Sequence, residues 1–158
     1  MDEIKKLREK IEQLEFEIKI EKSNLLSVER QLKKLQLYIE KIPATLIILD
    51  HIGNIEFINN YGIKLLGGGN KEEYIGKNWF DEFVPERVKE KVKFVFEKVS
   101  SGDLTPVEFY KNPVKTKFGS EKEILWRNNY LENENGEIVY TVGLGFDIES
   151  FQKFIKIL

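Results

Sequence analysis

The sequence contains no cysteine and a single histidine, His51. Without thiols the chain can form no disulfide, no cysteine-based zinc site and no thiolate nucleophile. A single imidazole also excludes a metal site built on a pair of histidines. We therefore expect no metal ion, and we expect His51 to be exposed because it lies in a predicted turn.

Long apolar runs are missing as well. No stretch approaches the roughly 20 apolar residues that cross a bilayer, and the first residues lack the pattern of a signal peptide. The net charge is −2, so no overall positive field favours nucleic acid or an anionic membrane. These absences predict a cytoplasmic protein without a membrane segment in this chain and without a nucleic-acid partner.

Glycine and proline are absent from the first 41 residues. With Ile4 at heptad position a, apolar residues fill nearly every a and d position, which predicts a coiled-coil dimerisation helix over residues 1–41. Glu21 occupies a d position, where two carboxylates would meet; it either sets the register or turns outwards. The predicted dimer interface consists of Ile4, Leu7, Ile11, Leu14, Ile18, Leu25, Val28, Leu32, Leu35 and Ile39.

The charges that flank this seam favour a parallel dimer. In that arrangement a residue at position g faces position e of the next heptad on the partner. The attractive pairs are Glu3–Arg8, Lys10–Glu15 and Glu17–Lys22. Exposed pairs contribute only about 0.3–0.5 kcal/mol each, so they select orientation more than they stabilise. The alternatives are an antiparallel bundle and a helix packed on its own domain.

Pro43 ends this helix, and the remaining chain predicts a mixed structure. The predicted strands are 44–50, 55–59, 107–118, 123–131 and 137–148. The predicted helices are 60–66, 70–75, 78–84 and an amphipathic helix over 86–100 that ends at Gly102. Because the strands are segregated from the helices, we expect an α+β fold with an antiparallel sheet.

Four segments in order resemble a PAS domain over residues 42–149. They are LDHIGNIEFIN, NYGIKLLG, YIGKNWFDEFVPE and WRNNYLENENGEIVYTVGLGFDIES. Asp147-Ile148-Glu149 stands where the family commonly ends in Asp-Ile-Thr. The resemblance implies a five-stranded antiparallel sheet with short helices on one face around a small cavity, and a sensory or dimerising role.

Two cofactors of that family have no attachment point here. Light-sensing flavin relatives carry a reactive cysteine after Gly-x-Asn, whereas Trp79 follows Gly76-Lys77-Asn78 in this chain. Haem-binding relatives need a histidine on the long helix, and residues 86–100 contain none. We expect neither group, which leaves noncovalent FAD or a small metabolite.

The resemblance also implies which residues line the cavity. Those expected to face it are Trp79, Phe83, Val95, Arg127, Asn129, Thr141, Gly143 and Gly145. A buried Arg127 would need an anionic partner and would therefore anchor a ligand. In the alternative phase of that strand, Trp126 and its alternate neighbours face inwards and Arg127 lies in water. In a further alternative, the aromatic residues simply fill the cavity.

The opposite face of the last strand is rich in apolar residues, among them Val142, Leu144 and Phe146. Such a face needs a cover, which we expect to be a flanking helix or a second subunit. Residues 150–158 are predicted to begin a C-terminal signalling helix, with apolar residues at helical spacing. These are Phe151, Phe154, Ile155 and Leu158.

No nucleophile–base pair or phosphate loop is visible, so we predict that the chain is not an enzyme. The sequence instead favours a homodimeric sensor module that relays a cue through coiled-coil helices to a downstream effector, such as a histidine kinase or diguanylate cyclase. One alternative is a stand-alone interaction platform without ligand. Another is the regulatory domain of a transcription activator.

Overall fold

The computed structural model describes residues 1–156, and the chain divides into two compact units, one of residues 1–39 and one that begins at Glu40. Leu158, which the sequence places on the C-terminal helix, lies outside the described residues, as do the side chains of Phe154 and Ile155. Within the described part of the chain, no helix is long and apolar enough to cross a membrane.

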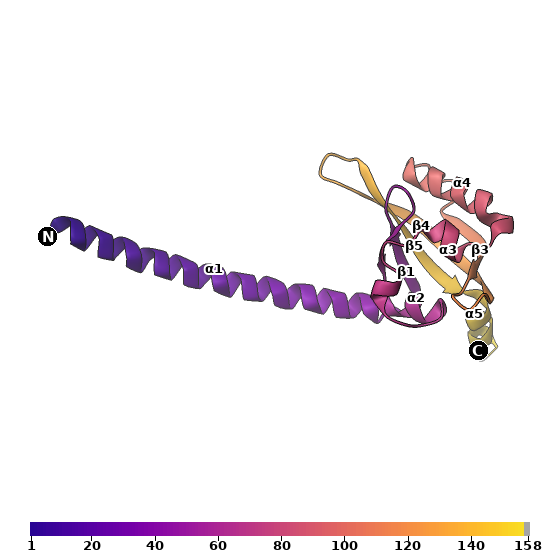
Figure 1. Ribbon diagram of the computed structural model, residues 1–158, viewed down its shortest axis with the longest axis horizontal. Helices are drawn as coiled ribbons and strands as arrows, with labels where there is room; N and C mark the ends of the chain where they lie inside the picture. The colour runs from indigo at the N-terminus through magenta and orange to yellow at the C-terminus, as the bar shows by residue number, and fades with distance from the viewer. Residues whose placement is uncertain (157–158) are drawn as a thin grey trace. The chain divides into compact units, whose positions relative to one another are not determined.

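The first unit is part of one helix, α1 (Asp2–Glu40), which has 39 residues and none buried (Figure 1). At 1.5 Å per residue it is about 58 Å long. The predicted long helix is therefore confirmed. Its apolar seam lies open to water, with Ile4 at 60% and Leu14 at 43% exposure. The pairing of that seam with a second chain stays a prediction.

The second unit is built on a five-stranded antiparallel sheet, as the resemblance implies, and its strands lie in the order β2-β1-β5-β4-β3 (Figure 1). Its strands are β1 (Thr45–Leu49), β2 (Ile55–Ile58), β3 (Phe109–Lys115), β4 (Glu121–Glu132) and β5 (Ile138–Asp147). The last strand therefore pairs with the first in the middle of the sheet, which brings both ends of the domain together.

Helices on one face of the sheet enclose the core. They are α2 (Asn60–Leu65), η1 (Lys71–Glu73), α3 (Trp79–Phe83), η2 (Glu86–Val88) and α4 (Lys89–Ser100), and α5 (Ile148–Ile155) follows the sheet. Asparagine side chains begin two of them: Asn59 accepts a hydrogen bond from the Gly62 N–H, and Asn78 accepts one from the Phe80 N–H. Helix α4 ends before Gly102, whose φ of +81° suits glycine.

The predicted boundaries differ from the observed ones where turns intervene. The strand predicted from Val107 begins at Phe109, because Val107 and Glu108 both donate backbone hydrogen bonds to the Leu104 carbonyl and form a turn. The helix predicted over 70–75 is a single 3-10 turn. Helix α5 begins two residues earlier than predicted, directly after Asp147.

The turn between β1 and β2 positions the start of α3. Asp50 accepts hydrogen bonds from the N–H groups of Ile52 and Asn54, and Gly53 adopts a φ of +87°. The Gly53 carbonyl then accepts a hydrogen bond from the Trp79 N–H at 2.8 Å. The exposed His51 belongs to this turn, so the hairpin is a scaffold that holds Trp79 in place.

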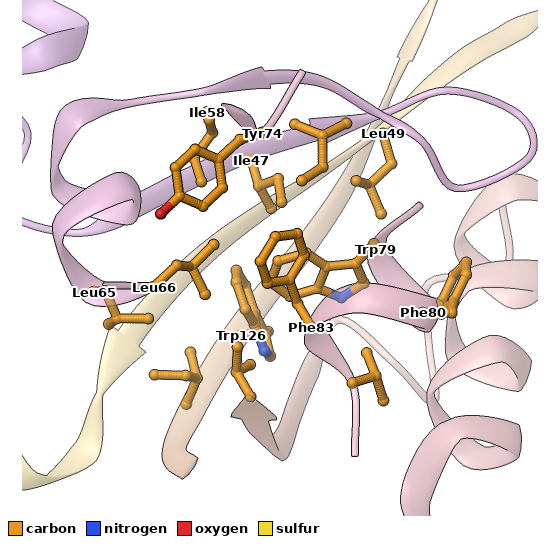
Figure 2. Close-up of a cluster of buried hydrophobic side chains, with 14 of the residues drawn as sticks. Ile47, Leu49, Ile58, Leu65, Leu66, Tyr74, Trp79, Phe80, Phe83 and Trp126 are labelled. Atoms are coloured by element: carbon orange, nitrogen blue, oxygen red, sulfur yellow. The ribbon is translucent and has the colours of Figure 1, made fainter. Parts of the chain in front are cut away.

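Three aromatic rings form the centre of the core between the sheet and α3 (Figure 2). The ring centroids of Trp79 and Trp126 lie 5.7 Å apart at an angle of 89°, and Phe83 lies 5.4 Å from Trp79. The contact between the two tryptophans is edge-to-face, and such a contact stabilises the core beyond the area it buries.

The other face of the sheet carries exposed apolar side chains. Leu125, Leu131 and Phe146 are each about 40% exposed, and Leu125 lies opposite Phe146 on the neighbouring strand. The apolar character predicted for this face is therefore present. What covers it stays a prediction.

Candidate ligand cavity

A cavity lies between the inner face of the sheet and helices α3 and α4. The volume in which the centre of a water molecule fits is about 60 Å³. The wall on the helix side is apolar, with Val92, Val95 and Phe96 from α4. The wall on the sheet side is mixed, because Asn112 and Asn128 add carboxamides to it.

Four of the residues predicted to face the cavity do line it: Trp79, Val95, Thr141 and Gly143. Whether they bind a ligand remains a prediction. Phe83 is buried in the adjoining core, where it packs on Trp79 and Tyr74 and does not line the cavity.

Gly145 is on the predicted face of β5 but leaves no open space. Trp126 lies opposite it on β4, and a Cβ atom on Gly145 would come within 2.6 Å of the indole ring. A Cβ on Gly143 would meet the same ring at 3.1 Å. The Trp126 side chain therefore takes up the space over both glycines, and of the two only Gly143 lines the cavity.

The expectation that Arg127 and Asn129 face the cavity is wrong. In β4 the buried residues are Ile124 and Trp126, and strict alternation puts Arg127 on the opposite face. Its side chain is 62% exposed and forms an ion pair with Glu108 at 3.3 Å. Burial of the large Trp126 indole decides which face of β4 points inwards. The arrangement observed is the alternative one, with Trp126 inside and Arg127 in water.

The sequence interpretation missed the two asparagines on the cavity wall. Asn112 is 5% exposed, and its Nδ2 donates to the Pro113 carbonyl at 2.9 Å. The Nδ2 of Asn128 donates to the Val107 carbonyl at 2.8 Å. Asparagine is disfavoured in strands, so its presence at inward positions of β3 and β4 was the signal that could have identified this polar wall.

The carboxylate of Asp147, the last residue of β5, pairs with a lysine of β4 and accepts hydrogen bonds from α5. Lys122 Nζ lies 3.2 Å from Asp147 Oδ2, and the Glu149 N–H and the Ser150 hydroxyl donate to the same carboxylate. Burial alone would raise the pKa of Asp147, but Lys122 and the helix donors outweigh it and hold the pKa below its usual value. The carboxylate is therefore a charged cap on α5.

Comparison with known proteins gives a result at the level of structure alone. No protein-family model matches the chain, and no curated protein matches it by sequence. The PAS domain of an HTR-like protein from Haloarcula marismortui superimposes with a TM-score of 0.62 at 17% identity, covering 80% of this chain and 98% of that one.

The chain has the PAS fold.

Two further PAS structures show what kinds of protein carry this fold. The PAS domain of the Cronobacter turicensis quorum-sensing receptor RpfR, in complex with C12:0, has a TM-score of 0.52 at 23% identity and covers 68% of this chain and 96% of that one. A PAS domain from a two-component sensor histidine kinase has a TM-score of 0.55 at 11% identity, covering 76% and 98%. The structural neighbours of this PAS fold therefore include sensory domains.

Proposed function

We propose that the chain is a cytoplasmic PAS sensor module that binds a small molecule in the cavity and acts as a homodimer. The observation that carries the proposal is the buried carboxamide of Asn112. Its Oδ1 has no hydrogen-bond partner among the described residues, although the side chain lines the cavity. An acceptor that reaches the surface of a cavity can bind water or a polar group of a ligand, so this oxygen offers a ligand one hydrogen bond.

The route from the cavity to an effector runs through the helices at both ends of the domain. Thr141 and Gly143 of β5 line the cavity, and the same strand continues through Asp147 into α5. A ligand that binds one arrangement of this strand more tightly shifts the population towards it. The effector is a signalling domain such as a histidine kinase or diguanylate cyclase, in line with the sensory neighbours of the fold.

The dimer forms through a parallel coiled coil of α1. This helix has an apolar seam without a single buried residue, and an isolated helix gains most of its stability from packing such a face. A second copy of the chain supplies a matching seam with attractive flanking charges.

The ligand is tested by native mass spectrometry of the full chain, compared with the same sample under denaturing conditions. A dimer that carries extra mass, lost on denaturation, supports an occupied cavity. A dimer without added mass that also binds no small molecule in solution favours the second candidate function, a dimerisation platform whose core is filled. The small volume of the cavity, above which the Trp126 ring packs on Gly143 and Gly145, is the observation that favours that candidate.

The dimer is tested by sedimentation with a pair of matched variants. Leu14→Asp places a charge in the seam, whereas Phe16→Asp makes the same kind of change at an exposed position outside it. We expect Leu14→Asp to sediment as a monomer and Phe16→Asp as a dimer. Wild-type protein that sediments as a monomer would exclude the coiled coil.

A further inference from the structure

We infer that the ligand of this cavity is a small, uncharged molecule with about six to nine non-hydrogen atoms, selected by the carboxamides of Asn112 and Asn128. This inference rests on the proposed function, because it specifies the ligand of the same site. Three features of the cavity support it: the lack of charged residues on its wall, its small volume, and the polar atoms on its wall that have no hydrogen-bond partner.

The cavity wall carries no formal charge. None of the residues that line it in the described structure is Asp, Glu, Lys, Arg or His. Arg127, which lies between the lining residues Trp126 and Asn128 in the sequence, is on the other face of the sheet and pairs with Glu108. A charged ligand would lose its hydration without meeting an opposite charge, which makes its binding strongly unfavourable. We therefore expect fatty-acid anions to bind poorly in this cavity.

The size of the cavity sets the size of the ligand. A water molecule needs roughly 10–15 Å³ of space for its centre, so the 60 Å³ cavity holds about four to six waters. Such a group of waters has the bulk of one aromatic ring with a small substituent. A twelve-carbon chain like the one bound by the RpfR domain is too long for this space.

The open polar atoms define the chemistry of the substituent. After the Nδ2 atoms of Asn112 and Asn128 have donated to backbone carbonyls, each side chain keeps an Oδ1 acceptor without a partner in residues 1–156. Trp79 and Trp126 also line the cavity, and within residues 1–156 neither indole N–H donates a hydrogen bond to the protein (Figure 2). A neutral group that donates and accepts, such as an amide, matches both kinds of atom.

Three probes of nearly equal shape test this inference: benzamide, benzoate and benzamidinium. The chain contains two tryptophans, and both line the cavity. Their two indole N–H signals in a ¹H–¹⁵N correlation spectrum therefore report binding directly. We expect benzamide to shift both signals with a Kd of about 1 mM, a value typical of so small a ligand. Benzoate and benzamidinium should bind at least about 10-fold more weakly.

Matched variants locate the selection on the cavity wall. Asn128→Asp puts a carboxylate beside the cavity, and Asn129→Asp makes the same change one residue along β4, on the exposed face. We expect Asn128→Asp to bind benzamidinium at least about 10-fold more tightly than wild type does. Asn129→Asp should keep the wild-type preference for benzamide.

The outcomes separate this inference from the proposed function. Wild-type protein that binds either charged probe as tightly as benzamide would overturn the neutral-ligand inference while leaving a ligand-binding cavity. Unchanged indole signals with all three probes at about 20 mM would overturn both, because the cavity would then be closed. If Asn128→Asp does not fold, the wild-type order of affinities decides the question alone.

Discussion

At the scale of single residues, two glycines on β5 determine how closely Trp126 approaches the sheet. Gly143 and Gly145 lie on the inner face, and the indole of Trp126 packs directly over both. Because glycine has no side chain, the large ring of Trp126 can approach the strand closely. The position of this ring in turn decides how much of the cavity remains open.

Substitution of Gly145 by alanine should destabilise the domain. The new Cβ would lie 2.6 Å from the Trp126 ring and 2.9 Å from Ile124, closer than carbon atoms tolerate, and both neighbours are buried. We expect the free energy of unfolding to fall by about 1–3 kcal/mol, measured by urea denaturation. Gly143→Ala is the control, because its nearest contact is 3.1 Å and should lower stability less. Equal losses for the two variants would contradict this account.

At the scale of elements, carboxylates fasten the helices at both ends of the domain. Asp147 caps α5 and pairs with Lys122 of β4. Glu40, the last residue of α1, accepts hydrogen bonds from Lys71 Nζ and from the Asn60 N–H, both at 2.6 Å. Glu40 belongs to the second unit, so each carboxylate holds one end of that unit against other elements of the same unit.

Removal of the Asp147 charge should make the stability of the domain less dependent on acid pH. The pKa of Asp147 is held below its unfolded value, so its contribution is complete above about pH 4 and is lost as the pH falls through the folded pKa. We expect Asp147→Asn to lower the free energy of unfolding by about 1–3 kcal/mol at pH 7, and by less at about pH 2.5.

Urea denaturation of the Asp147→Asn variant at the two pH values measures this difference, at one fixed protein concentration. Asparagine retains the ability to cap α5, so the comparison isolates the charge. Glu134→Gln, at an exposed hairpin position, should change stability little at either pH. A loss for Asp147→Asn that is equally large at both pH values would show that the charge is not responsible.

The contact between Glu40 and Lys71 should appear as a coupling energy in a double-mutant cycle. Both side chains are partly buried, and Lys71 Nζ also lies 4.5 Å from the centre of the Phe57 ring. We expect Glu40→Gln and Lys71→Met to be coupled by about 0.5–1.5 kcal/mol in the free energy of unfolding. Glu40→Ala should in addition speed hydrogen exchange at the Asn60 amide. If the losses of stability were additive and hydrogen exchange at the Asn60 amide were unchanged, Glu40 would not hold this end of the domain in place.

At the scale of the whole molecule, one polar position in the seam affects the strength of the dimer that we propose. Glu21 occupies a d position between Ile18 and Leu25, and in a parallel dimer two carboxylates meet there. This repulsion weakens the coil in its middle, and a polar core residue also restricts the register. In the proposed dimer, Glu21 therefore lowers the affinity between the two helices at this turn.

Substitution of Glu21 by leucine should strengthen the dimer. Leucine is the preferred d residue of parallel two-stranded coils, and the change removes the repulsion, so we expect the dimer dissociation constant to fall at least about 10-fold. Sedimentation equilibrium of the full chain measures it. Glu12→Leu, at an outer heptad position, is the control and should leave the constant nearly unchanged. A similar gain in dimer affinity in both variants would indicate nonspecific hydrophobic association of the helix.

The sequence by itself determined the long helix, the α+β class and the strand order along the chain, because these follow from local signals: heptad spacing, proline and glycine stops, and asparagine caps. It also placed Trp79, Val95, Thr141 and Gly143 on the cavity wall. Only the tertiary structure decided which side chains of β4 face the core, and which side chain packs over Gly143 and Gly145. Alternation in β4 offers two faces with apolar residues on each, and only the packing of Trp126 against β5 and Trp79 selects between them. That choice moves Arg127 into water, brings Asn112 and Asn128 to the cavity, and leaves the cavity without charge.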